Sequence, residues 1–176
     1  MKLSANAVAL AGIFLFLNGG ASAQTINDAQ IASIVLTANQ VDIDAGKLAT
    51  MRAKAAETKK FGQLMVTDHT GVNKAATELA TRLGVTPQDN PTSQSLKAEG
   101  EKNVAQLKTL KGAAFDKAYV DHEVTYHQQV IDALDKTLIP GATNAELKAL
   151  LVKVRPAFVA HLEHAKRLQT TASGRH

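Results

Sequence analysis

The sequence predicts an all-α fold: a four-helix bundle with a short extra helix in the crossover between two helical hairpins. Four segments carry apolar residues at helical spacings of three and four, and no segment shows the apolar–polar alternation of a β-strand. A polar, turn-rich stretch separates the first two helical segments from the last two. Two hairpins joined by one long connection are typical of ferritin-like bundles.

The chain begins with the features of a secretory signal peptide over residues 1–23. Lys2 supplies a positive charge, residues 7–17 are apolar, and Ala21, Ser22 and Ala23 form a small-residue cleavage site. This apolar run is too short for a membrane helix, which needs roughly 20 residues. We therefore expect an exported mature chain, soluble in the periplasm and without a transmembrane segment. Residues 24–170 would form one helical-bundle domain, and residues 171–176 a disordered tail.

The composition excludes several classes of protein. There is no cysteine, so the chain has no disulfide, no thiolate metal site and no lipid anchor attached through cysteine. The formal net charge of +4 is scattered along the sequence rather than gathered into a basic block. Nucleic-acid binding needs a concentrated basic surface, so we expect no nucleic-acid partner. An envelope protein and a second copy of this chain remain as candidate partners.

The first hairpin comprises two helices whose boundaries differ in clarity. Residues 25–28 resemble a capping box with Asp in place of Glu, and the helix they open is expected to end near Arg52. The boundary at 53–58 is weak because it lacks Gly and Pro. The second helix is expected to end at Leu83 and Gly84, with Pro87 shortly after.

The second hairpin follows a more polar crossover. Residues 93–110 predict a shorter helix on the outside of the bundle, and residues 115–138 predict a central helix with two apolar faces. Residues 143–146 read as a capping box that opens the last helix. Pro156 lies inside this helix and is expected to kink it about one turn before His161.

Three histidines lie where the helical periodicity predicts a buried side chain. His127 and His161 occupy seam positions at which Leu or Val would be expected, and His69 lies beside a seam position taken by Asp68. An imidazole that is buried without a partner is costly, so each ring must meet a hydrogen-bonding group or a metal. Three histidines on three helices of one bundle are typical of a metal site in a bundle core.

Carboxylates on the same helices complete the candidate site. Glu123 lies four residues before His127 and therefore on the same helix face, and the first helix offers Asp42 or Asp44. The candidate metal ligands are His69, His127, His161, Asp68, Glu123 and Asp44. Imidazole with carboxylate suits Zn, Cu, Fe or Ni. The alternative is a purely structural network in which these groups hydrogen-bond one another or Tyr119 and Tyr126.

No catalytic motif accompanies these residues. A zincin motif would need its second histidine at position 126, where Tyr stands, and no Glu-x-x-His pair occurs on any predicted helix. The ordinary di-iron site of ferritin-like bundles requires that pair on two helices. Phosphate-binding loops, dinucleotide fingerprints and a cysteine nucleophile are also absent. His122 and His164 are expected to lie at the half-exposed flanks of their helices.

Several short segments, taken in order, resemble one exported bacterial family. They are 46–49 (GKLA), 61–69 (FGQLMVTDH), 115–119 (FDKAY) with His127, 147–148 (LK), and Pro156 with 161–165 (HLEHA). The chain is similar in these segments to the domain-of-unknown-function 4142 family, whose members are often labelled as outer membrane proteins. The resemblance implies a ferritin-like bundle in the periplasm or envelope, with no established activity.

The resemblance also marks particular positions. Asp68, His69, His127 and His161 match the polar positions that recur in the family. Where the family often has Asp directly before the third-helix histidine, this chain has Tyr126, which removes one possible ligand. The leading hypothesis is a periplasmic bundle that binds a transition metal. The alternative is a non-catalytic structural or stress-associated envelope protein, and an enzyme is the third hypothesis.

Overall fold

The computed structural model describes residues 26–173, and the predicted signal peptide lies outside this range. The described chain is helical, with no strand, which confirms the all-α prediction. Its elements are α1 (Asp28–Arg52), α2 (Ala56–Arg82), α3 (Pro91–Thr109), α4 (Gly112–Ala133), the π-helical turn η1 (Leu134–Leu138), α5 (Ile139–Gly141) and α6 (Ala145–Ser173). None of these helices is long and apolar enough to cross a membrane.

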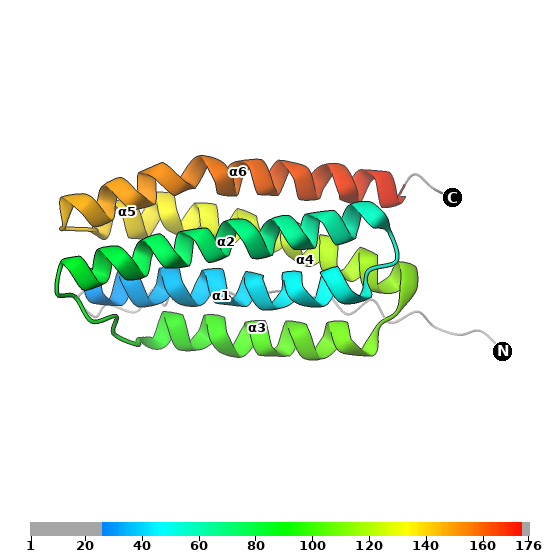
Figure 1. The fold of residues 1–176 in the computed structure, drawn as a ribbon, viewed down its shortest axis with the longest axis horizontal. Helices are drawn as coiled ribbons and strands as arrows, with labels where there is room; N and C mark the ends of the chain where they lie inside the picture. Colours follow the sequence, from blue (N-terminus) through cyan, green and yellow to red (C-terminus); the bar gives the residue numbers. More distant parts are fainter. Residues whose placement is uncertain (1–25, 174–176) are drawn as a thin grey trace, which may run out of the picture.

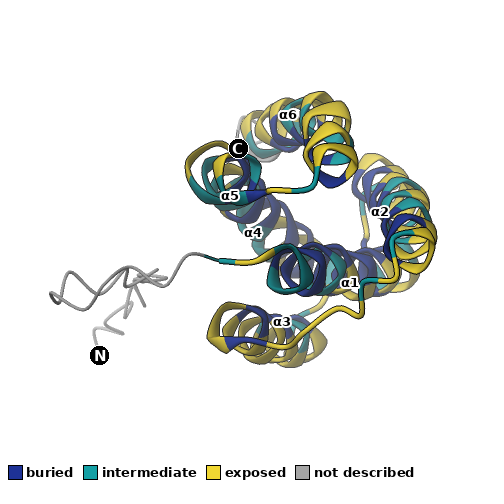
Figure 2. Ribbon diagram, turned by 90° about the vertical axis from the view of Figure 1, so that its left-hand side faces the viewer, coloured by how far each residue is buried: buried dark blue, intermediate teal, exposed yellow. Residues whose placement is uncertain are grey.

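The four long helices form two antiparallel hairpins, α1 with α2 and α4 with α6 (Figure 1). Helix α3 carries the chain back along the whole bundle, so that α2 and α4 run in the same direction (Figure 1). It packs against α1 outside the four-helix core, and its outer side is exposed (Figure 2). This is the predicted bundle with one long crossover.

Two apolar clusters fill the core on either side of a polar layer. One contains Ile31, Ile34, Leu79, Ile131, Leu151 and Phe158, among others. The other contains Leu48, Phe61, Met65, Phe115, Tyr119 and Ala165, among others. Between the two clusters, each of the four long helices places a buried polar side chain in the bundle interior: Asp42, His69, His127 and His161. The apolar layers therefore hold four polar groups at one level.

The close approach of α1 and α2 depends on two glycines that face each other. A Cβ added at Gly62 would lie 2.8 Å from Ala49 Cβ and 2.9 Å from the Gly46 carbonyl oxygen. A Cβ at Gly46 would lie 2.8 Å from the Gly62 carbonyl oxygen. Real Cβ atoms do not approach backbone this closely, so both positions require glycine at the observed separation. The contact brings Asp42 of α1 close to His69 of α2.

Both predicted capping boxes were misplaced. The N-cap of α1 is Asn27, which forms a capping box with Gln30 instead of the expected Thr25–Asp28 pair. The carboxylate of Asp28 instead accepts hydrogen bonds from the loop before α6, at 2.9 Å from Thr143 N and 3.0 Å from Asn144 N. The α6 cap is the Asn144 side chain, one residue after the predicted Thr143, because Thr143 is engaged by Asp28.

The weak boundary between α1 and α2 is stabilised from another helix. No side chain caps the N-terminus of α2 from within its own segment. Asp116 of α4 supplies the acceptor: its two carboxylate oxygens accept from Lys54 N and Ala55 N, each at 2.8 Å. At the other end of the chain α6 reaches Ser173, so the helix includes residues 171–173, where we expected the tail to begin.

Candidate metal centre

The polar layer gathers six buried side chains at mid-height in the bundle. They are Asn39 and Asp42 from α1, His69 from α2, Glu123 and His127 from α4, and His161 from α6, and each is 4 % exposed or less. Their positions follow from helical spacing, since Asn39 and Asp42 are three residues apart and Glu123 and His127 are four apart. Every helix of the four-helix core therefore contributes to one polar cluster.

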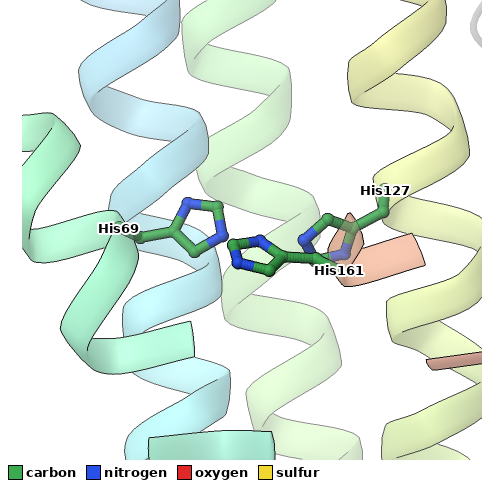
Figure 3. Close-up of side chains that lie close together, drawn as sticks. All are labelled: His69, His127 and His161. Carbon is green, nitrogen blue, oxygen red and sulfur yellow. The ribbon is translucent and has the colours of Figure 1, made fainter. Parts of the chain in front are cut away.

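The three imidazole rings converge on a common region (Figure 3). Their ring centroids lie 5.7 Å apart for His69 and His127, 5.3 Å for His69 and His161, and 5.4 Å for His127 and His161. One nitrogen of each ring lies within 4.8 Å of a nitrogen of both others. Phe158 of α6 lies beside all three rings and lines one side of the cluster.

Each ring is held through its other nitrogen by an oxygen acceptor. His69 Nδ1 lies 2.7 Å from Asn39 Oδ1, His127 Nδ1 lies 3.0 Å from the Glu123 carbonyl oxygen, and His161 Nε2 lies 2.8 Å from Asp68 Oδ2. Because an oxygen acceptor requires a protonated nitrogen, these contacts fix the tautomer of each neutral ring. In the neutral form of each ring, the opposite nitrogen therefore carries the lone pair.

These opposite nitrogens have no hydrogen-bond partner among the described residues. His69 Nε2, His127 Nε2 and His161 Nδ1 are buried and unpartnered. Buried polar atoms are almost always paired, so three unpartnered nitrogens in one cluster need an explanation. A metal bound by histidine has this arrangement, in which the second nitrogen donates to an oxygen that orients the ring.

Asp42 adds an oxygen to the same region. Its Oδ2 lies 2.6 Å from His69 Nε2 and 3.4 Å from His127 Nε2. Neither contact has hydrogen-bond geometry, and both Asp42 oxygens lack hydrogen-bond partners. The carboxylate and the two nitrogens are thus close together without being directed at each other. This arrangement fits three ligand atoms directed at a shared cation.

The charges of the carboxyl groups differ because of their surroundings. Burial opposes the ionisation of Asp42, but the neighbouring imidazoles of His69 and His127 outweigh it and lower its pKa. Burial and then the Asp42 carboxylate raise the pKa of Glu123 well above its ordinary value. The surroundings therefore favour the charged carboxylate at Asp42 and the neutral carboxylic acid at Glu123.

Burial also keeps histidines of the cluster neutral. It lowers the pKa of His127 to about 4, although the Asp42 carboxylate opposes the change. It lowers the pKa of His161 as well, with the hydrogen bond to Asp68 acting in the other direction. Neutral imidazole is the form that binds metals, so these two ligands need not lose a proton at pH 7.

The structure brings together most, but not all, of the predicted site residues. His69, His127, His161 and Glu123 lie in the cluster, and Asp68 lies at its edge with its side chain 39 % exposed. Asp44 is not in the cluster. It is exposed and interacts with Gln40 and Lys47 on the surface of α1.

Asp42, the other acid considered on the first helix, is the residue that enters the cluster. Asn39 was not predicted, although its spacing of three from Asp42 on an otherwise apolar face was a usable signal. His122 and His164 lie outside the cluster, and both are partly exposed as expected. The ring of His122 stacks on Tyr126, and that of His164 packs edge-on against Phe61.

The donors fall into two groups that share His127: His69, His127 and His161, and Asp42, Glu123 and His127. Imidazole nitrogen together with carboxylate oxygen suits a divalent transition metal. The hydrogen-bonded second nitrogens and the apolar layers above and below would hold these donors in place. No curated protein and no solved structure matches the chain. The family described as a domain of unknown function (DUF4142) matches residues 18–168. This match covers most of the chain and all six side chains of the cluster, and the chain therefore belongs to the DUF4142 family.

Proposed function

We propose that this protein binds a single divalent transition metal ion in the core of its bundle. The ligands are His69 Nε2, His127 Nε2, His161 Nδ1 and Asp42 Oδ2. The observation that supports this most directly is that all three nitrogens are buried and unpartnered, while the opposite nitrogen of each ring is held by an oxygen. A structural network would pair these nitrogens with donors instead.

Three further residues would orient the ligands. Asn39, the Glu123 carbonyl and Asp68 hold the rings in the tautomers that metal binding needs. The carboxyl group of Glu123 lies within reach of both Asp42 and His127. As a neutral acid it adds no negative charge to the cluster until a cation lowers its pKa. Zn, Cu, Fe and Ni all accept this set of nitrogen and oxygen donors.

We place this activity in the periplasm. The signal-peptide features of residues 1–23 and the absence of cysteine support an exported chain. In an oxidising compartment, histidine and carboxylate are ligands that do not form disulfides. Binding, storage or transfer of the metal requires no catalytic group, in keeping with the lack of a catalytic motif.

Metal content tests the proposal. The mature protein is purified untagged from periplasm without chelator, and its Zn, Cu, Fe and Ni are quantified. A His127→Ala/His161→Ala variant removes two proposed ligands. A His122→Ala/His164→Ala variant is the matched control, because it removes two histidines that lie outside the cluster.

We expect close to one metal per chain in the wild type and in the control, and none in the ligand variant. A protein that holds no metal when purified is titrated with each of the four ions by calorimetry. If no ion binds the wild type, or if the ligand variant binds as well as the control, the proposal is wrong. The polar cluster would then be a structural network.

A further inference from the structure

Two turns lie side by side at one end of the bundle, the α1–α2 turn and the α3–α4 turn (Figure 1). Direct contacts join them. The Arg52 guanidinium, at the end of α1, donates to the Lys108 carbonyl oxygen at 2.7 Å and to the Leu110 carbonyl oxygen at 3.2 Å. In return, the Asp116 carboxylate of α4 accepts from two backbone N–H groups of the α1–α2 turn. The two turns are therefore fixed against each other, together with the side chains that they carry.

Four exposed lysines at this end form no ion pair with any residue that the structure describes: Lys54, Lys59, Lys108 and Lys111. They lie in the α1–α2 turn, the first turn of α2, the last turn of α3 and directly before α4. A Cβ added at Gly112 would lie 3.9 Å from Lys54 Cδ, so the Lys54 side chain lies beside the start of α4, next to Lys111. We call these four lysines the basic end.

The acidic residues that flank the basic end do not neutralise it. Three of them pair with a lysine of their own helix: Glu57 with Lys60 at 2.9 Å, Asp121 with Lys117 at 2.5 Å, and Glu163 with Lys166 at 2.9 Å. The fourth, Asp116, is buried, and Arg52 carries a charge of opposite sign at the same two turns. The basic end therefore keeps a positive charge of its own.

The opposite end of the bundle has no comparable excess of charge among the described residues. There Arg82 pairs with Glu146 across two helices, Arg155 pairs with Asp135 at 2.5 Å, and Lys136 pairs with Asp132 at 2.7 Å. The positive charges that are scattered along the sequence are thus sorted by the fold. The basic end draws its lysines from segments between positions 54 and 111, which only the packed bundle brings together.

An exposed apolar side chain accompanies the lysines. Met51 lies in the last turn of α1 and is 70 % exposed, and it lines a surface groove together with Lys108. Unpaired lysines beside an exposed apolar side chain suit the surface of an anionic membrane, where lysine attracts the lipid phosphates and the apolar group enters the boundary of the hydrocarbon. Nucleic acids and acidic proteins share the attraction to lysine but offer no such apolar boundary.

We propose that the basic end binds the surface of a membrane that contains anionic phospholipid. The two turns face the membrane, the four lysines lie against lipid phosphates, and Met51 lies at the interface. Each lysine near an anionic membrane surface strengthens binding by about fivefold. This surface is separate from the polar cluster in the core, so the binding does not depend on the metal and is measured in EDTA.

Sedimentation with vesicles tests the proposal. The mature chain is mixed with vesicles of phosphatidylcholine alone, or of phosphatidylcholine and phosphatidylglycerol in equal parts, and the bound fraction is measured. At about 0.1 M salt, where charges are screened over roughly 10 Å, we expect binding to the anionic vesicles only. A further increase in salt should weaken it, because lysine and phosphate are then screened from each other.

Two double variants form a matched pair. Lys54→Gln/Lys111→Gln removes two charges of the basic end and should weaken binding to the anionic vesicles by about 25-fold. Lys148→Gln/Lys153→Gln removes the same charge from exposed positions in the first half of α6 and should leave binding unchanged. Met51→Gln should remove the part of the binding that survives at high salt. Urea unfolding of each variant shows that it is folded.

Equal binding to neutral and anionic vesicles overturns the proposal, as does an equal loss of binding in the two double variants. A short DNA duplex is the competitor. If it displaces the protein from the vesicles while Met51→Gln binds them as the wild type does, the basic end is a general anion-binding surface and the membrane assignment is wrong. Should Lys54→Gln/Lys111→Gln not fold, Lys59→Gln/Lys108→Gln makes the same test.

Discussion

Replacing Asp42 by Asn is expected to lower both the stability of the metal-free protein and its affinity for metal. The substitution preserves the shape of the side chain and removes its charge. The carboxylate is 1 % exposed; burial would raise its pKa, but the neighbouring imidazoles of His69 and His127 lower it. A carboxylate whose pKa is lowered in the folded state stabilises that state above its unfolded-state pKa. Asp42→Asn should therefore lower the free energy of unfolding of the metal-free protein at pH 7 by about 1–3 kcal/mol.

Zinc should widen this difference in stability between the wild type and the variant. At a free zinc concentration of 100 times Kd, binding stabilises the wild-type protein by about 2.7 kcal/mol. Loss of a group that only orients a ligand weakens metal binding by about 10–100-fold. Loss of the single anionic ligand should therefore cost about 100-fold or more. At the same zinc concentration the variant would gain less than about 1 kcal/mol.

Urea unfolding with EDTA and with zinc measures both effects. Asp44→Asn is the control, because it makes the same chemical change two residues away at an exposed position. It should alter neither the stability nor the zinc increment. The reasoning is refuted if Asp42→Asn stabilises the EDTA-treated protein, or if zinc stabilises the variant as much as the wild type. The first result would show that burial outweighs the imidazoles at Asp42, and the second that Asp42 is not a ligand.

Three further predictions concern the packing that positions the cluster. Gly62→Ala should destabilise the protein by about 1–3 kcal/mol in urea unfolding, because its Cβ would meet the α1 backbone. Gly71→Ala on the same helix has open space and should stabilise by about 0.5–1 kcal/mol, and the opposite sign would refute the close-packing argument. Asp116→Ala should cost about 2–3 kcal/mol, measured in the same way, because Lys54 N and Ala55 N lose a charged acceptor; an unchanged midpoint would contradict this role. Burial would raise the pKa of Asp28, but the hydrogen bonds from Thr143 and Asn144 lower it below its ordinary value. The stabilising contribution of the Asp28 carboxylate is therefore present above its unfolded-state pKa and is lost as the pH falls through its lower folded-state pKa. The difference in stability between wild type and Asp28→Asn should vanish as the pH falls from about 5 to about 2.

The helices and the buried histidines could be predicted because their signals are local. Apolar spacing along each helix placed His127 and His161 inside the bundle, and the structure buries both. The turn-rich segment before α3 and the polar character of α3 predicted an outer crossover helix, which is also confirmed. These inferences needed only the period of a helix and the cost of burying a polar ring.

The choice between Asp42 and Asp44 could not be made from the same signal. Helix α1 packs on α2 and α4 on one side and is covered by α3 on the other. Apolar residues therefore surround most of its circumference, and periodicity does not single out one inward face. Asp44 lies on the exposed side of α1, where it lines the surface groove beside α3. Which of the two acids faces the interior is a property of the packed bundle, not of the α1 sequence.

The contact that holds the turn before α2 was hidden for a different reason. Ala55 cannot cap a helix, and the segment 53–58 contains none of the usual boundary residues. The acceptor comes from Asp116, 61 residues beyond Ala55. Sequence reasoning treats caps as local, so it found a weak boundary where the structure has a strong one. Asp28 shows the same effect, because its partners are 115 and 116 residues away.

The structure changes the interpretation of Tyr126, which stands where the family resemblance implies an aspartate. The family often has Asp before the third-helix histidine, and its replacement by Tyr126 removed a candidate ligand from consideration. The Tyr126 hydroxyl donates a hydrogen bond to the Ala38 carbonyl oxygen, and its ring stacks on His122. The Tyr126 and His127 rings are perpendicular, at an interplanar angle of 88°. The four proposed ligands come from four other positions, so the departure leaves the donor set intact. What it changes is the contact between α4 and α1, because the Tyr126 hydroxyl reaches the Ala38 carbonyl oxygen across the two helices.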